Sequence, residues 1–196
     1  MSSRDTILAA VRANQPAPAP VIPDIPLFER PAGLLVAEFR EALLRMGGKF
    51  AETQEGEDLN RFIRSLFPQA QVICSAVPEV KGNRALSGIV EPADLADVDV
   101  GVVRAAFAVA ETGSIWLSET ELQVNSLAFL AQHLLAFLDP GDIVGNLHHA
   151  YGNPRFKTAR YAVLVTGPSA TADIEGVLIH GAQGVRSLTV VLLLRS

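Results

Sequence analysis

The sequence has few of the residues that build redox or metal centres. Its 196 residues include one cysteine, Cys74, whereas an iron–sulfur cluster or a structural zinc site uses several thiolates. Cys74 stands in an apolar run, where a free cysteine is more often a buried strand residue than a reactive thiol. His148 and His149 are adjacent, and neighbours on a helix point about 100° apart, a poor geometry for one metal ion. We therefore expect no metal and no cofactor held by this chain alone.

Charge and long apolar runs are also scarce. Charged residues make up 19% of the chain, and the net charge is −5 without a basic cluster, which argues against a nucleic-acid or anionic-membrane surface. The longest apolar runs, such as 190–194, are far shorter than the ~20 residues that span a bilayer. Because the N-terminal residues lack the apolar segment of a signal peptide, we expect a cytoplasmic protein without a membrane span.

Two regions of different composition divide the chain. Ser2 or Ser3 is a suitable cap for a short helix, and a proline-rich stretch, 15–26, follows as an extended connector. With 49% hydrophobic residues, the rest is long enough to bury one sizeable core. The sequence predicts an N-terminal helical arm and linker over 1–32 and one domain over 33–196.

Within the domain, helical and strand patterns alternate. Helical spacing appears at 34–46 and 58–66, and Asp139-Pro140 is a typical helix start. Apolar strands are predicted near Phe50 and at 71–75, 161–166 and 188–194. The segment 125–138 fits either one helix or a loop followed by a strand at 133–138. The pattern predicts an α/β fold of three layers, a Rossmann-like, mostly parallel sheet with helices on both faces.

The stretch 98–117 holds the most informative polar turn. Two apolar runs, predicted as the two central strands, flank Glu111-Thr112-Gly113. Glu111 is then either a solvated loop residue or a carboxylate held at the rim of the sheet, where it would suit base chemistry.

A second polar stretch follows the strand that ends near residue 166. Gly167 permits close backbone approach to a ligand, Ser169 and Thr171 supply hydroxyl groups, and a helix is predicted to run to about Ile179. The amino end of that helix would favour an anion. Alternatively, Ser169 or Thr171 is only a helix cap, and Asp173 and Glu175 complement the helix dipole.

Two ordered signatures resemble a known family. Ala110-Glu-Thr-Gly-Ser-Ile115, preceded by 96–107, is similar to the first signature of the LUD-domain family, in its lactate utilization protein C group. The second is Thr166-Gly-Pro-Ser-Ala-Thr-Ala-Asp-Ile-Glu175 with Gly181-Ala-Gln-Gly-Val-Arg186 and the apolar last strand. The segment 140–148 fits between them, and the resemblance covers roughly residues 35–196.

The resemblance implies a fold similar to the ribose-phosphate isomerase and coenzyme A transferase superfold. It also implies a three-protein system that oxidises L-lactate to pyruvate, whose other two members carry the iron–sulfur clusters. This chain would be an accessory subunit without redox chemistry or catalysis of its own, binding those partners and a small organic acid. In the related transferases a glutamate beside a glycine at a strand turn is the nucleophile, so a free-standing isomerase or transferase that uses Glu111 is the alternative. The expected ligand-binding residues are Thr112, Gly113, Thr166, Gly167, Ser169, Thr171, Asp173 and Glu175.

The chain departs from the family pattern at three positions. Ala170 stands where a basic residue is expected, and Gln183 and Val185 replace a histidine and a proline in the final turn. Without that cation, Arg104 and Arg186 are left as candidate positive groups.

Overall fold

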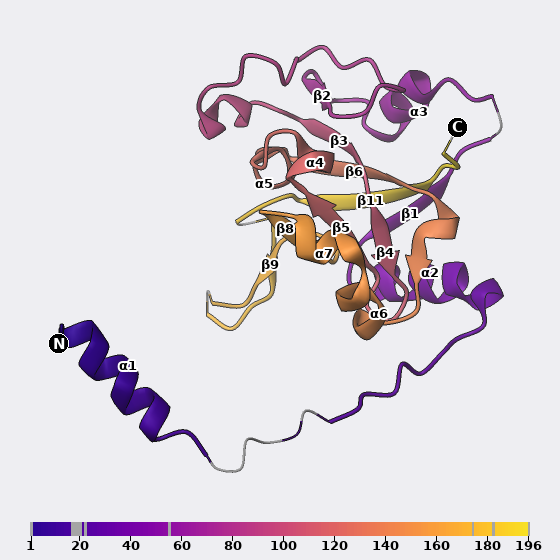
Figure 1. Ribbon diagram of the computed structural model, residues 1–196. Helices are drawn as coiled ribbons and strands as arrows, with labels where there is room; N and C mark the ends of the chain where they lie inside the picture. The colour runs from indigo at the N-terminus through magenta and orange to yellow at the C-terminus, as the bar shows by residue number, and fades with distance from the viewer. Residues whose placement is uncertain are drawn as a thin grey trace.

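A five-stranded parallel sheet forms the centre of the protein (Figure 1). The computed structural model describes residues 2–16, 21, 23–54, 56–173, 175–181 and 183–195. Its central strands lie in the order β1-β11-β6-β3-β2. They are β1 (Lys49–Glu52), β2 (Ile73–Ser75), β3 (Val100–Arg104), β6 (His133–Leu138) and β11 (Ser187–Leu192). The middle strands are apolar because both of their faces are covered.

A second sheet of four strands packs beside the first. It runs β7-β4-β5-β8, with β4 (Phe107–Val109), β5 (Ser114–Ser118), β7 (Ile143–Val144) and β8 (Ala162–Val165). The prediction of two central strands in 98–117 is therefore wrong, because only β3 belongs to the central sheet. The chain changes sheets at two residues: the Ala105 N–H bonds to Phe137 in the central sheet, and the Ala106 N–H bonds to Trp116 in the second. β4 and β5 then form an antiparallel hairpin around Glu111-Thr112-Gly113.

Helices cover the outer faces of both sheets. Ile63 of α3 (Leu59–Leu66) joins the core on one face of the central sheet, and α2 (Leu35–Arg45) packs with the second sheet against the other face. Beyond the second sheet, α6 (Leu147–Gly152) and α7 (Pro154–Thr158) cover Trp116, which is buried as an inward strand aromatic. The short elements are α4 (Glu119–Leu122), α5 (Leu127–Leu130) and three 3₁₀ turns at Ala32–Leu34, Pro92–Leu95 and Pro140–Asp142. The predicted fold class, α/β with a mostly parallel sheet flanked by helices, is confirmed.

Several local predictions are also confirmed. Ser2 caps α1 (Ser3–Ala13) in a reciprocal capping box with Asp5. The helix predicted over 58–66 is α3, and the side chain of Asp58 is its cap. The helical spacing at 34–46 corresponds to α2, and Gly47, at φ +82°, follows its end. In the ambiguous segment 125–138, the alternative with a strand at 133–138 is correct, because β6 pairs with both β3 and β11.

The helix predicted to start at Asp139-Pro140 is wrong. The side chain of Asp139 accepts the Gly141 N–H at 2.8 Å, as a cap would, but only a 3₁₀ turn follows. The chain then pairs with β4 as β7, and the helix begins seven residues later than predicted, where Asn146 caps α6 by accepting the His149 N–H.

The helix predicted from Gly167 to Ile179 is also wrong. In its place β9 (Ala170–Thr171) and β10 (Ile179–His180) form a two-stranded antiparallel arm. The Ser169 N–H donates to the Val185 carbonyl, and the Ser169 carbonyl accepts the Gly181 N–H. Glu175 and Gly176 have positive φ angles, which a continuing α-helix does not allow. Ile174, within the predicted helix, lies outside the described residues.

Among the described residues of the N-terminal arm, those at its end contact the domain. α1 buries no residue and stands apart from the sheets in Figure 1. Residues 17–20 and 22 of the predicted linker are not among those described. Three contacts then join the chain to the domain: the carbonyl of Leu27 accepts from Asn146 at 2.6 Å, Glu29 lies 3.3 Å from His149, and Arg30 pairs with Glu38. No described helix is both long and apolar enough to cross a bilayer.

Candidate functional site

The two predicted signatures meet at the carboxyl end of α2. β5 pairs with β8, and this pairing brings the turn at 111–113 beside Thr166 and Gly167. Both glycines pack directly on α2. A Cβ on Gly113 would lie 2.3 Å from the Leu43 nitrogen, and one on Gly167 would lie 2.4 Å from the Met46 oxygen. Gly113 is therefore buried under the helix and serves packing.

Three hydroxyl groups connect the signatures. Thr112 Oγ1 lies 2.7 Å from Ser114 Oγ, which lies 2.5 Å from Thr166 Oγ1. Ser114 is buried, so this chain of hydrogen bonds fixes the rotamers of the two threonines at its ends. Ser114 was not among the predicted site residues, although it follows Gly113 directly in the first signature.

The predicted carboxylate lies at the rim of an open pocket of about 540 Å³. Glu111 is exposed, and its Oε2 accepts the N–H of Leu147 at 3.2 Å, at the amino end of α6. The walls combine polar and apolar groups: Arg45, Met46, Thr112, Ser114, Leu147, Tyr151, Leu164 and Thr166. Glu111 and Thr112 of the first signature and Thr166 of the second thus line the same pocket.

The other residues of the second signature lie farther along the arm. Ser169 and Gly167 line a separate apolar pocket of about 270 Å³, which Thr166 shares. Thr171 belongs to β9 and its Oγ1 accepts the Asp173 N–H at 3.3 Å, whereas Asp173 and Glu175 are exposed. No helix starts among the described residues of 167–179, so the anion-binding helix terminus expected from the sequence is not found there.

A second cleft opens at the carboxyl edge of the central sheet. Open α/β sheets typically bind ligands outside the carboxyl ends of their parallel strands. Residues that follow β2, β3 and β11 line this cleft, which has a volume of about 390 Å³. Its charged wall residues are Glu79, Arg104, Glu121, Arg155 and Arg195.

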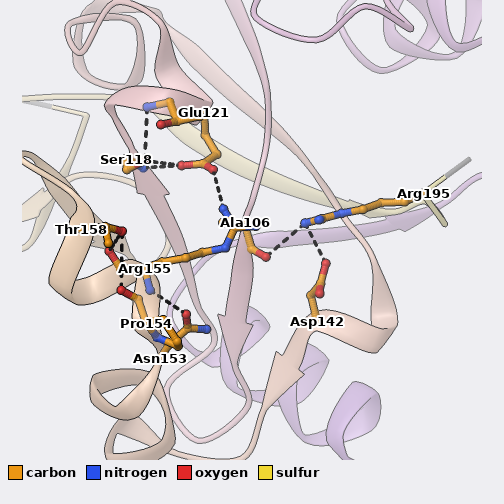
Figure 2. Close-up of polar contacts among 10 residues, drawn as sticks. Ala106, Ser118, Glu121, Asp142, Asn153, Pro154, Arg155, Thr158 and Arg195 are labelled. Carbon is orange, nitrogen blue, oxygen red and sulfur yellow. Dashed lines mark hydrogen bonds and ion pairs between the residues drawn. The ribbon is translucent and has the colours of Figure 1, made fainter.

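Three arginines converge in this arginine cleft, which we define by Arg104, Arg155 and Arg195. Arg155 comes from α7 and Arg195 from the segment after β11, and Figure 2 shows their side chains extending toward each other on either side of Ala106. Arg195 donates to the Ala106 carbonyl at 3.1 Å, and Arg104 donates to the Leu193 carbonyl at 3.2 Å. The Arg104 guanidinium also lies over the Phe137 ring, 5.5 Å from its centroid.

Each arginine has one carboxylate partner. Arg104 lies 2.6 Å from Glu79, Arg195 lies 2.8 Å from Asp142, and Arg155 lies 3.6 Å from Glu121. The Glu121 carboxylate is already engaged, because it accepts both the N–H and the hydroxyl of Ser118. The long Arg155–Glu121 contact leaves most of the Arg155 donors available to a bound anion.

The backbone of Arg195 is held by a carboxylate. Asp139 accepts its N–H at 2.8 Å, and this bond, followed by that from Gly141, lowers the pKa of Asp139 below its ordinary value. Asp139, predicted as a helix cap, therefore helps to position an arginine of the cleft.

The donors of Arg155 favour an anionic ligand in the cleft. Three carboxylates match the three guanidinium groups, Glu79 and Glu121 in the wall and Asp142 beside Arg195, but the Arg155–Glu121 contact of 3.6 Å is the longest of the three. A guanidinium binds a carboxylate through two parallel hydrogen bonds, so the arrangement suits a small organic acid.

Sequence reasoning found this cleft only in part. Arg104 was a candidate positive group, and it lines the cleft, whereas Arg186 lies at the opposite edge of the sheet. Arg155 and Arg195 were not singled out. Arg104 and Arg195 lie at or just after the ends of apolar strands, and that position at the carboxyl edge was the available signal.

The described residues contain no group of three or more histidine, cysteine or acidic side chains arranged for a metal ion. Cys74 is buried in β2, as predicted, and burial raises the pKa of its thiol. The thiol is therefore protonated at neutral pH.

Comparison with known proteins places the chain in a family. No curated protein matches it at a significant level. Among solved structures, the chain resembles a DUF162 family protein from Deinococcus radiodurans with a TM-score of 0.65 and 15% sequence identity, over 84% of this chain and 99% of that one. The sequence profile of the LUD domain matches residues 92–193, more than half of the chain and both signatures. The protein belongs to the LUD domain family.

Proposed function

We propose that the chain is a carboxylate-binding, non-redox subunit of a cytoplasmic lactate utilization system, of the lactate utilization protein C group. Iron–sulfur partner proteins would carry the electrons when L-lactate is oxidised to pyruvate. Family membership and the two signatures support this assignment. The observation that carries it is the arginine cleft, which offers a small carboxylate paired hydrogen bonds at the edge where such sheets bind ligands.

The chemistry of the cleft fits a short 2-hydroxy or 2-oxo acid. Its volume of about 390 Å³ exceeds what a three-carbon acid occupies, and its walls include both polar and apolar residues. Arg155 has the most free donors and is the expected carboxylate ligand, while Arg195 is held in place by Asp139 and Asp142. Since the carboxylates of the cleft, Glu79 and Glu121, both pair with arginines, we assign this chain binding and presentation of the acid, and assign the oxidation step to its partners.

Calorimetric titration of the purified protein with L-lactate and pyruvate tests the binding. The variant Arg155→Gln should weaken binding about tenfold or more, because it removes a charge-assisted hydrogen-bond pair. Arg61→Gln, an exposed arginine on α3, is the matched control and should bind as the parent does. Equal affinity in the parent and in Arg155→Gln would exclude the arginine cleft as the carboxylate site.

The partner proposal has its own test. The tagged chain, isolated from cells grown on lactate, should bring down cysteine-rich iron–sulfur proteins. Recovery of the chain alone from such cells would count against an accessory role.

A second candidate function is a free-standing isomerase or transferase that uses Glu111. The observation in its favour is the pocket of about 540 Å³, where Glu111 lies at the rim near Arg45 and the hydroxyl of Thr112. Activity of the purified chain on acyl-coenzyme A or sugar phosphates, lost in Glu111→Gln, would support it. Absence of turnover, or turnover unaffected by that substitution, would reject it.

A further inference from the structure

Basic residues gather at the amino edge of the central sheet, opposite the arginine cleft. Three neighbouring parallel strands, β1, β11 and β6, start here. Lys49 is the first residue of β1, His133 is the first of β6, and Arg186 directly precedes β11. All three line one pocket of about 320 Å³, which is closed on its other side by the chain that follows α3, residues 66–70.

His133 is a half-buried wall residue of this amino-edge pocket. Its Nδ1 lies 2.8 Å from the hydroxyl of Ser187, a buried residue, and its ring packs on Phe67 with centroids 5.1 Å apart. These contacts fix the ring plane. Because Nδ1 is engaged by Ser187, Nε2 is the ring nitrogen left to meet a molecule in the pocket.

The positive groups have few protein partners. Within the described part of the chain, neither Lys49 nor Arg186 forms an ion pair. Asp99 is the acidic residue of the pocket wall, and one of its oxygens accepts the N–H groups of Gln71 and Val72 at 2.7 and 2.9 Å. Asp99 thus also holds the start of β2, and its single negative charge balances at most one of the two cations.

Like charges consequently act on His133. Burial is the main cause that lowers the pKa of His133, the charges of Lys49 and Arg186 lower it further, and Asp99 opposes them. Two cations and a histidine whose protonation they disfavour therefore face the same space, and a bound anion would relieve the repulsion between the cations.

We propose that the amino-edge pocket is a binding site for a tetrahedral oxyanion of the phosphate class, held by Lys49, Arg186 and His133. A phosphate has enough oxygens to accept from a lysine, a guanidinium and an imidazole at once, whereas a carboxylate has only two. The site is separate from the arginine cleft and does not depend on the function proposed for it. The ligand is inorganic phosphate or the phosphate group of a small ester.

The test is an NMR titration of the His133 ring in the full chain with inorganic phosphate, against sodium chloride at equal ionic strength. Bound phosphate should give a saturable shift of the ring signals and raise the pKa of His133 by on the order of one pH unit, because an opposite charge favours the imidazolium. A parallel titration with glycerol 3-phosphate distinguishes the sources: tighter binding of the ester identifies an organic phosphate, and equal or weaker binding identifies free phosphate.

Two variants and a control complete the experiment. Lys49→Gln and Arg186→Gln should each weaken phosphate binding about fivefold or more, whereas Lys81→Gln, an exposed lysine elsewhere, should leave it unchanged. Both basic residues are exposed, so their substitution leaves the core intact. The proposal is overturned if phosphate acts on His133 no more than chloride does, or if Lys49→Gln and Arg186→Gln bind phosphate as well as Lys81→Gln.

Discussion

At the scale of single residues, Gly113 shows how a family signature serves packing before chemistry. Its φ of +68° lies in the region that favours glycine, and the hairpin turn it occupies lies against the backbone of α2 at Ala42 and Leu43. This contact places the first signature against α2. Gly167 places the second signature against the end of the same helix, at the Met46 carbonyl. The two glycines therefore determine how close the signatures come, and the hydroxyl groups beside them form the connection.

We predict that Gly113→Ala destabilises the protein by about 3 kcal/mol, because it combines backbone strain with overlap against α2. Gly88→Ala is the matched control, since Gly88 has φ +93° but open space around its Cβ position. That control should cost about 1–2 kcal/mol, the backbone part alone. Urea unfolding followed by Trp116 fluorescence measures both values. Equal losses in the two variants would mean that the contact with α2 contributes nothing.

At the scale of elements, the predictions were correct where the local sequence pattern fits only one kind of secondary structure. Ser2 and Asp58 cap helices whose following residues repeat at helical spacing, and β6 and β11 are apolar enough to require burial. The helix predicted for 167–179 was wrong because the residues that can cap a helix are equally suitable for turns. The backbone hydrogen bonds of Ser169 with Val185 and Gly181 stabilise the two-stranded arm of β9 and β10 instead.

The arginine cleft was out of reach for a different reason. Its three arginines come from β3, α7 and the end of the chain, and no local spacing joins them. The fold class alone predicts that the carboxyl ends of parallel strands form a site. It does not predict that α7, which packs on the second sheet, places Arg155 at the carboxyl edge of the central sheet.

Glu119 supplies a prediction about how elements are joined. At the start of α4, its carboxylate accepts the N–H groups of Arg160 and Tyr161 at 3.0 and 3.1 Å, just before β8. These backbone bonds lower the pKa of Glu119 below its ordinary value of 4.5, with the bond from Arg160 as the largest cause. The folded pKa lies below the unfolded one, so the stabilisation is fully present above about pH 4.5 and is lost as the pH falls through the folded pKa.

We therefore expect Glu119→Gln to lower the Tm at pH 7, with the difference from the parent shrinking as the pH falls below 4.5. Glu41→Gln is the control, because Glu41 is largely exposed and forms only an ion pair with Arg45 on the same helix. Thermal unfolding by circular dichroism from pH 3 to pH 7 makes the comparison. A Tm difference that stays constant over this range would show that the charge of Glu119 is not the cause.

At the scale of the whole molecule, the polar features are distributed over separate edges. The arginine cleft lies at the carboxyl edge of the central sheet, the amino-edge pocket lies at the other, and Glu111 lies beyond α2 beside the second sheet. The two-sheet arrangement produces this separation. The chain leaves the central sheet at Ala105 and Ala106 and continues along β4, so the hairpin turn that contains Gly113 lies at the end of the second sheet. A ligand in one place therefore need not compete with a ligand in another.

The arm gives a prediction about where the folded domain begins. α1 buries nothing, whereas Leu27, Glu29 and Arg30 contact Asn146, His149 and Glu38. Asn146 is 5% exposed, so losing the Leu27 carbonyl leaves its amide short of an acceptor, at a cost of about 1 kcal/mol. A chain that begins at residue 23 should keep the Tm of the full chain, and one that begins at residue 32 should lose about 2–4 °C.

Differential scanning calorimetry of the full chain and of the two truncated chains shows whether the N-terminal arm stabilises the domain. If the chain beginning at residue 23 already loses as much as the shorter one, α1 or the linker stabilises the domain by contacts beyond those of residues 27–30. If neither truncation changes the Tm, water replaces the Leu27 carbonyl at Asn146 without cost. The expected result, a loss confined to the removal of residues 23–31, would assign those residues to the folded domain and leave α1 as a helix free to contact another molecule.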